Sequence, residues 1–121
     1  MNYITGNVKK NILVIGQGFI GRFLSQFLSY NENLEVHNVT SEHLNYFNKD
    51  EILDFFDDYS EQGCNFDYVI NCVGYGGENN IDDLIYFKDK ARRYNSDLPL
   101  IIATALSQLD NIPLIHLSSG D

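Results

Sequence analysis

Three closely spaced glycines are the residues of this sequence with the clearest chemical meaning. The pattern Gly-x-Gly-x-x-Gly is formed by Gly16, Gln17, Gly18, Phe19, Ile20 and Gly21. In such a pattern the first glycine permits a tight turn, the second leaves room for a pyrophosphate, and the third lets a helix pack closely on a strand. The free N–H groups at the start of that helix then face an anion. We therefore predict that these six residues bind the phosphates of a dinucleotide.

The segments on either side of the glycines have the periodicity that such a site needs. Residues 11–15 are a continuous apolar run, as expected for a strand covered on both faces of a parallel sheet. From Phe19 to Leu28 the apolar residues recur at steps of three and four, which indicates an amphipathic helix ending near residues 30–31. This context favours a dinucleotide site over the alternative, an ordinary turn that contains glycine.

The rest of the chain predicts alternating strands and helices. We expect further strands at 34–39, at 44–47 as a short third strand, at 66–73 and at 112–117, with a glycine-rich loop at 74–80. With right-handed crossovers this order gives an α/β fold, a doubly wound parallel sheet of the Rossmann type. Residues 1–121 would form one NAD(P)-binding domain.

Two helices are expected between these strands. Asn48 is a candidate cap, with Glu51 three residues later, for a helix that ends at Gly63. Helical periodicity returns over residues 81–109 and is interrupted at Pro99, which either kinks the helix or starts a second one capped by Ser96 or Asp97.

The end of the second strand bears on the choice of cofactor. An acidic residue about 20 positions after the glycines often binds the adenosine ribose, and here that place falls to Asn38. An amide can bond a ribose hydroxyl without repelling a 2′-phosphate, and Thr40 and Ser41 are nearby candidate donors. An amide bonded to its own backbone is an equal alternative. NAD and NADP therefore both remain candidates.

The charge and polarity of the chain limit its partners. Seventeen acidic residues against eight basic ones give a formal net charge of −9. Because this charge repels phosphate backbones and anionic lipids, we expect neither nucleic acid nor a membrane as a partner. The longest apolar run is too short to span a bilayer and residues 1–10 do not resemble a signal peptide, so a cytoplasmic location is expected.

The cysteines and histidines do not predict a metal site. Cys64 and Cys72 match no close-spaced zinc or redox pattern and are expected to be free thiols. His37, His43 and His116 are widely separated in the sequence. His116 lies in an apolar strand, where a hydrogen-bonded core histidine is the better explanation.

Four stretches resemble one family in their order and spacing. They are residues 12–24 around the glycines, residues 67–74 (Asp-Tyr-Val-Ile-Asn-Cys-Val-Gly), Asn95 with Pro99 four positions later, and residues 112–119 (Ile-Pro-Leu-Ile-His-Leu-Ser-Ser). Together they resemble the extended short-chain dehydrogenases/reductases, the NAD-dependent epimerase/dehydratase family, and within it the dTDP-4-dehydrorhamnose reductases. The resemblance implies the N-terminal Rossmann part, truncated before the C-terminal substrate region. It also implies that Cys72, Val73 and Gly74 line the cofactor and that Asn95 lies on a helix beside the active site.

The residues for proton transfer are where the chain departs from that family. By the resemblance Ser119, rather than Ser118, would hydrogen-bond the reacting oxygen of the substrate, although a serine pair also suits an ordinary turn. The family's catalytic tyrosine, and the lysine that lowers its pKa, come well after this serine. Tyr86 and Lys90 show the required spacing but precede Asn95, so a solvated helix face explains them better.

Two functions follow from these observations. The first is the NAD(P)-binding domain of an epimerase, dehydratase or reductase acting on a nucleotide sugar, a fragment without the catalytic Tyr-Lys pair and inactive on its own. The alternative is a non-catalytic dinucleotide-binding or regulatory module that works with a partner chain. In both cases strand 112–117 leaves an open sheet edge, through which we expect the chain to oligomerise.

Overall fold

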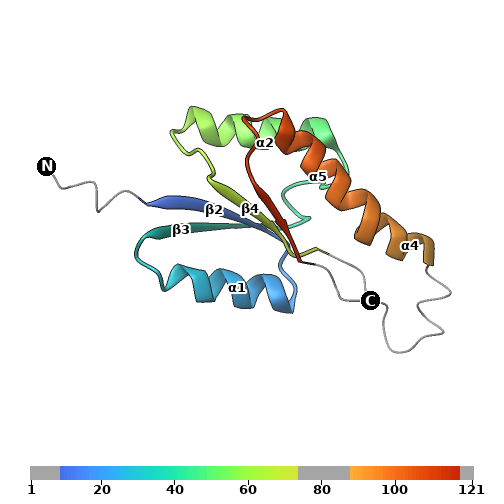
Figure 1. Ribbon diagram of the computed structural model, residues 1–121, viewed down its shortest axis with the longest axis horizontal. Helices are drawn as coiled ribbons and strands as arrows, with labels where there is room; N and C mark the ends of the chain where they lie inside the picture. Colours follow the sequence, from blue (N-terminus) through green and yellow to red (C-terminus); the bar gives the residue numbers. More distant parts are fainter. Residues whose placement is uncertain (1–8, 74–87, 118–121) are drawn as a thin grey trace, which may run out of the picture.

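In the computed structural model, residues 9–73 and 88–117 are described and form a parallel sheet with helices on both faces (Figure 1). The strands are β2 (Lys10–Ile15), β3 (Leu34–Val39), β4 (Tyr68–Asn71) and β5 (Leu114–His116). The helices are α1 (Phe19–Ser29), α2 (Lys49–Glu61) and a run of α4 (Lys88–Arg92), the π-helical turn η1 (Arg93–Asp97) and α5 (Leu98–Ser107). The sheet order is β3-β2-β4-β5. The predicted α/β, doubly wound architecture is therefore confirmed for this part of the chain.

The central strand β2 explains why the sheet is buried on both sides. Leu13 and Val14 are fully buried and Ile15 is 1% exposed, although neighbouring side chains point to opposite faces. Val14 pairs with Asn38 on β3 and with Ile70 on β4. Because all pairings are parallel, the carboxyl ends of the strands meet at one edge of the sheet, where ligands of open α/β folds bind.

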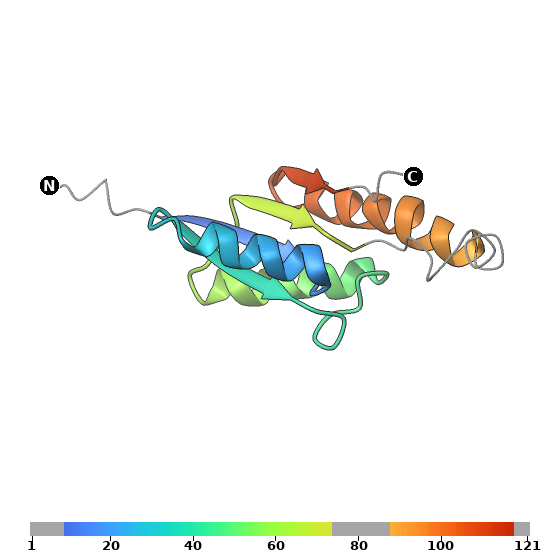
Figure 2. The ribbon, with the colours of Figure 1, turned by 90° about the horizontal axis from the view of Figure 1, so that it is seen from below.

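The helices form two layers, which bury apolar clusters of different size against the sheet. Figure 2 shows α1 lying alone across one face of the sheet, with α2 on the other face. The core on the α2 and α5 side includes Ile52, Leu98 and Ile102, each at most 1% exposed. The core on the α1 side is a smaller cluster around Ile12, Val14 and Ile70.

The expectation of a short third strand at 44–47 is wrong. Leu44 and Tyr46 are buried, which produces the alternation typical of a strand. The backbone here bonds locally instead, because Asn45 Oδ1 accepts from Phe47 N at 3.0 Å and Glu51 Oε1 accepts from Asn45 N at 3.0 Å. Side-chain acceptors have replaced a strand partner, and the segment forms turns.

The long C-terminal helix continues through the proline. Pro99 lies in the first turn of α5, and the π-helical turn Arg93–Asp97 directly precedes it. A proline ring clashes with a regular α-helical backbone, and the wider turn relieves that clash. Asp97 is itself helical and makes no side-chain capping bond within the described residues, so of the two alternatives at Pro99 the one with a capped second helix is wrong. None of the helices in the two described ranges is long and apolar enough to cross a membrane.

The predicted cap of α2 is confirmed and can be tested. Asn48 Oδ1 accepts a hydrogen bond from Glu51 N at 3.1 Å. Replacing Asn48 with alanine should lower the free energy of unfolding by about 1 kcal/mol, because a backbone N–H loses its acceptor. Urea titration measures this, with Asn48→Asp as the control that keeps an acceptor. Equal losses in both variants would contradict the capping role.

Candidate functional site

The turn between β2 and α1 is built around Gly16. Its φ of 110° is one that residues with a side chain rarely adopt. Gly16 N donates to Val39 O at 2.9 Å, which ties the turn to the end of β3. A Cβ on Gly16 would lie 2.9 Å from Val73 Cγ2, so the Val73 side chain fills the space beside the turn. The ends of three neighbouring strands are thus fixed around one glycine.

The other two glycines face very different surroundings. A Cβ on Gly21 would lie 2.4 Å from the carbonyl oxygen of Gly16, so α1 rests directly on the backbone of the turn. A Cβ on Gly18 would meet nothing within 4 Å among the described residues. Gly18 is also the N-cap of α1 and forms no side-chain cap in this part of the chain. The first N–H groups of α1 have no partner within the helix, and the space beside Gly18 is open in the described part of the chain.

Asn38 supports the glycine turn from the neighbouring strand. Its Nδ2 donates to Gly16 O at 2.8 Å and to Val14 O at 3.1 Å. Both N–H groups of the amide are therefore used, and only Oδ1 remains for a ligand. Asn38 lines a shallow groove of ≈510 Å³ beside α1, together with Gln17, Phe19 and Arg22.

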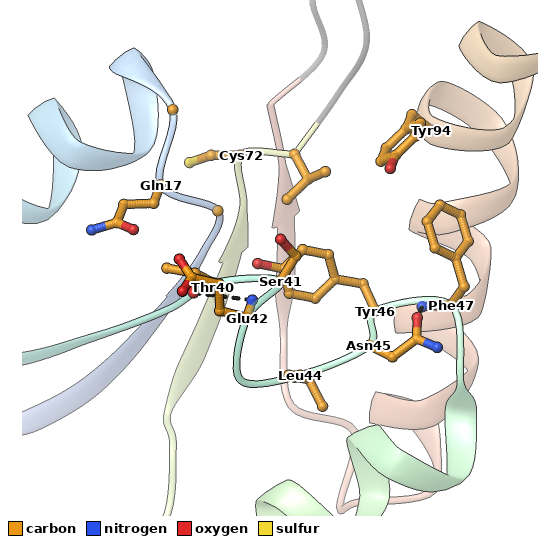
Figure 3. A pocket seen from close by; sticks show the side chains of 13 residues that line it. Gln17, Thr40, Ser41, Glu42, Leu44, Asn45, Tyr46, Phe47, Cys72 and Tyr94 are labelled. Carbon is orange, nitrogen blue, oxygen red and sulfur yellow. Dashed lines mark hydrogen bonds between the residues drawn. The ribbon is translucent and has the colours of Figure 1, made fainter.

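A second cleft, of ≈490 Å³, lies above the carboxyl ends of the strands (Figure 3). Its lining comes from the glycine turn, from the loop after β3, from the end of β4 and from η1. The residues are Gly16, Gln17, Gly18, Thr40, Ser41, Glu42, Leu44, Asn45, Tyr46, Phe47, Cys72, Val73 and Tyr94. In Figure 3 Gln17 and Tyr94 lie at opposite sides of the cleft, with Ser41 and Tyr46 between them.

Aromatic side chains form one wall of this cleft. Phe47 packs edge-on against Tyr94 with ring centroids 5.1 Å apart, and the Arg93 guanidinium lies 4.2 Å from the centroid of Phe47. Tyr46 is buried and its hydroxyl donates to Val39 O at 3.1 Å. Burial, and then the neighbouring Tyr94, raise the pKa of Tyr46 to about 12. Tyr46 is therefore a neutral structural donor near neutral pH.

The end of β4 is held by a buried amide. Asn71 is fully buried, and its Oδ1 accepts from Val73 N at 3.1 Å while its Nδ2 lies 3.0 Å from His116 Nδ1 on β5. Burial raises the pKa of the adjacent Cys72 thiol, which keeps it protonated at neutral pH. Cys72 thus lines the cleft as a small apolar residue, without the thiolate that a nucleophile would need.

The structure separates the predicted site residues into groups. Gly16, Gln17, Gly18, Cys72 and Val73 meet in the cleft, whereas Phe19 and Asn38 line the groove beside α1. Ile20 is half exposed, Gly21 is the buried residue of α1, and Asn95 lies on η1 next to Tyr94. Gly74, Tyr86, Ser118 and Ser119 lie outside the described residues.

The aromatic wall of the cleft was not predicted from the sequence. Tyr46, Phe47 and Tyr94 line the cleft, and Thr40 and Ser41, considered only as phosphate donors, line it as well. The sequence signal for this wall was the alternation of apolar residues at Leu44 and Tyr46 after the second strand. We interpreted it as a strand, whereas it belongs to a loop that lines the cleft. Among residues 9–73 and 88–117 no group of three His, Cys, Asp or Glu could hold a metal ion.

Comparison with known proteins places this geometry in a familiar fold. No family model matches the sequence, and no curated protein matches it. Among solved structures, dTDP-4-dehydrorhamnose reductase from Bacillus anthracis in complex with NADP superposes with a TM-score of 0.70 at 20% identity, covering 88% of this chain and 35% of that one. The Clostridium acetobutylicum dTDP-4-dehydrorhamnose reductase gives 0.67 at 24% identity, with 86% and 34% covered.

A mutant short-chain dehydrogenase/reductase from Serratia marcescens is also similar, with a TM-score of 0.63, 17% identity, and 91% and 57% covered. The chain thus spans about a third of the length of the two dTDP-4-dehydrorhamnose reductases that it resembles. These likenesses show that the described residues share the Rossmann fold of short-chain dehydrogenases/reductases.

Gly18 and Gly21, which lie at the start of α1, should respond differently to one added methyl group. Gly21→Ala should lower the free energy of unfolding by about 1–3 kcal/mol, because the new Cβ meets the backbone carbonyl of Gly16, which cannot move aside as a flexible side chain can. Gly18→Ala should leave it within about 0.5 kcal/mol, because a poorer helix cap and a stiffer unfolded chain offset each other. Chemical denaturation of both variants measures the contrast. Similar losses at the two positions would show that the space at Gly18 is not free.

Proposed function

We propose that this chain binds a nicotinamide dinucleotide, with the pyrophosphate at the N-terminus of α1. The observation that carries this proposal is the free space at Gly18, where a Cβ would meet nothing within 4 Å of the described chain, beside a helix start without a side-chain cap. Backbone N–H groups and the helix dipole can hold phosphate there without a basic side chain. The NADP bound by the similar Bacillus anthracis reductase supports the same ligand class.

The cleft provides separate surroundings for the rest of such a ligand. Thr40, Ser41 and Asn45 offer polar groups beside the end of β3, and Phe47 and Tyr94 offer aromatic surface. Cys72 and Val73 offer a small apolar wall at the end of β4. An apolar lining with a few polar groups is typical of cofactor sites.

We further propose that the chain is the cofactor-binding part of a reductase, dehydrogenase or epimerase acting on a nucleotide sugar. The similarity to dTDP-4-dehydrorhamnose reductases supports this substrate class. A bound nicotinamide would supply or accept hydride. Ser119 would orient the reacting oxygen by a hydrogen bond, and the acid/base group that exchanges the matching proton would come from outside residues 1–121, in the same polypeptide or in a partner.

Substitution of Gly18 tests the binding site. Gly18→Val should weaken binding of NADH and NADPH by roughly a hundredfold or more, about 2.7 kcal/mol, because the side chain fills the pyrophosphate position. Isothermal titration calorimetry with both dinucleotides measures this. The control is the free energy of unfolding, which should stay close to that of the wild type. Equal affinity in the wild type and the variant would contradict the assigned site.

Asn38 gives a second test, which separates support of the turn from direct contact with the ribose. Because its amide donors are bonded to Gly16 and Val14, Asn38→Ala should loosen the turn and weaken NADH and NADPH roughly tenfold each. The ratio of the two dissociation constants should therefore stay the same. A variant that changes the ratio while one affinity is kept would show that Asn38 contacts the ribose itself.

A further inference from the structure

The buried Asn71 connects two strands and the start of the loop that lines the cleft. Its backbone oxygen accepts from Leu117 N at 3.0 Å, and the next residue, Cys72, donates its N–H to Ile15 O at 2.9 Å. Its side chain spans from His116 on β5 to Val73 N. Because Asn71 is fully buried, water cannot replace either side-chain partner.

The backbone N–H of Val73 determines how the Asn71 amide and the His116 ring are oriented. Val73 N–H can only donate, so the amide of Asn71 must present Oδ1 to it at 3.1 Å. The amide then presents its NH2 group to His116 Nδ1 at 3.0 Å. That nitrogen must accept, and an imidazole nitrogen accepts only when it carries no proton. In this arrangement Nδ1 of His116 carries no proton, and the proton of the imidazole lies on Nε2.

The chain of contacts continues to the glycine turn. Val73 lines the cleft, and its Cγ2 lies so close to Gly16 that a Cβ on Gly16 would be only 2.9 Å from it. A shift of Val73 would therefore either open the space beside Gly16 or press on the turn. His116, Asn71, Val73 and Gly16 thus form a continuous path from β5 to the start of the cleft.

We propose that His116 is a positioning residue of the dinucleotide site: its bare Nδ1 orients the Asn71 amide, which in turn fixes Val73 against the glycine turn. This inference rests on the proposed function for its effect on cofactor binding. The orientation itself does not, because it follows from the hydrogen bonds of the protein alone. Protonating or removing Nδ1 would allow the amide to rotate and would leave Val73 N–H without its acceptor.

The tautomer of His116 tests the orientation in the wild-type chain. Long-range proton–nitrogen correlation spectra at mildly alkaline pH, where an ordinary imidazole is neutral, should show the proton on Nε2. In Asn71→Asp the carboxylate has no proton to donate, so the ring should take up a proton on Nδ1 and change its nitrogen signature. A wild-type ring protonated on Nδ1 would overturn the proposal.

Hydrogen exchange tests whether His116 positions Val73. In His116→Phe the exchange of Val73 N–H should accelerate, whereas that of Leu117 N–H, which donates to the backbone of Asn71, should stay slow. His116→Asn places an amide oxygen near the position of Nδ1 and should restore slow exchange at Val73. Equal acceleration at Val73 and Leu117 would mean that β5 had simply detached, and unchanged exchange at Val73 would mean that His116 has no such role; either outcome overturns the proposal.

The affinity for a dinucleotide tests whether the path from His116 to Gly16 affects the proposed site. We expect His116→Phe to weaken dinucleotide binding roughly three- to tenfold, the effect of one lost hydrogen bond, and His116→Asn to recover most of it. Full affinity in His116→Phe, despite faster exchange at Val73, would overturn the link to the site. If the wild-type chain binds neither NADH nor NADPH, the proposed function fails, and the tautomer and exchange measurements still decide the orientation of Asn71.

Discussion

The contact between Gly21 and the backbone of Gly16 is the constraint on which the rest of this site depends. The position of a Cβ on Gly21 would be 2.4 Å from Gly16 O, so any side chain there would push α1 away from the turn. Because α1 rests on the turn, its N-terminus lies at the edge where β2, β3 and β4 end. Gly16 N bonds Val39 O and Cys72 N bonds Ile15 O, which ties those ends together. A larger residue would therefore disturb the helix and three strands at once.

The unequal layers make this contact more important. The α2 and α5 face is held by extensive apolar packing around Leu98, Ile102 and Leu106. On the other face, α1 buries few residues and leaves Phe23 and Phe27 58% and 62% exposed, with their rings stacked 6.2 Å apart. Side-chain burial alone therefore attaches α1 weakly, since exposed aromatic surface contributes little to folding. The close backbone approach at Gly21 fixes where α1 lies on the sheet.

The sequence predicted the features that depend on local pattern and missed those that depend on competing hydrogen bonds. The glycine motif, the continuous apolar run of β2 and the Asn48 cap each have a local signature, and the structure shows the turn, the buried strand and the capping bond. Segment 44–47 alternates like a strand, but Asn45 and Glu51 supply acceptors that hold its backbone in turns. The π-helical turn before Pro99 likewise follows from fitting a ring into a packed helix, which periodicity does not reveal.

Three polar side chains near the end of β3 are bonded within the protein itself, and this limits what they offer to a ligand. Asn38 bonds two carbonyls, Tyr46 bonds Val39 O, and Thr40 Oγ1 accepts from Glu42 N at 3.3 Å. The groups left at the glycine turn are backbone N–H groups, whose positive ends attract an anion locally even though the chain carries a net charge of −9. Recognition through the main chain requires a particular backbone path and places few demands on side chains other than the glycines. Such a backbone path can be kept while most residues differ, and the fold itself is shared with the Bacillus anthracis reductase at a TM-score of 0.70 and 20% identity.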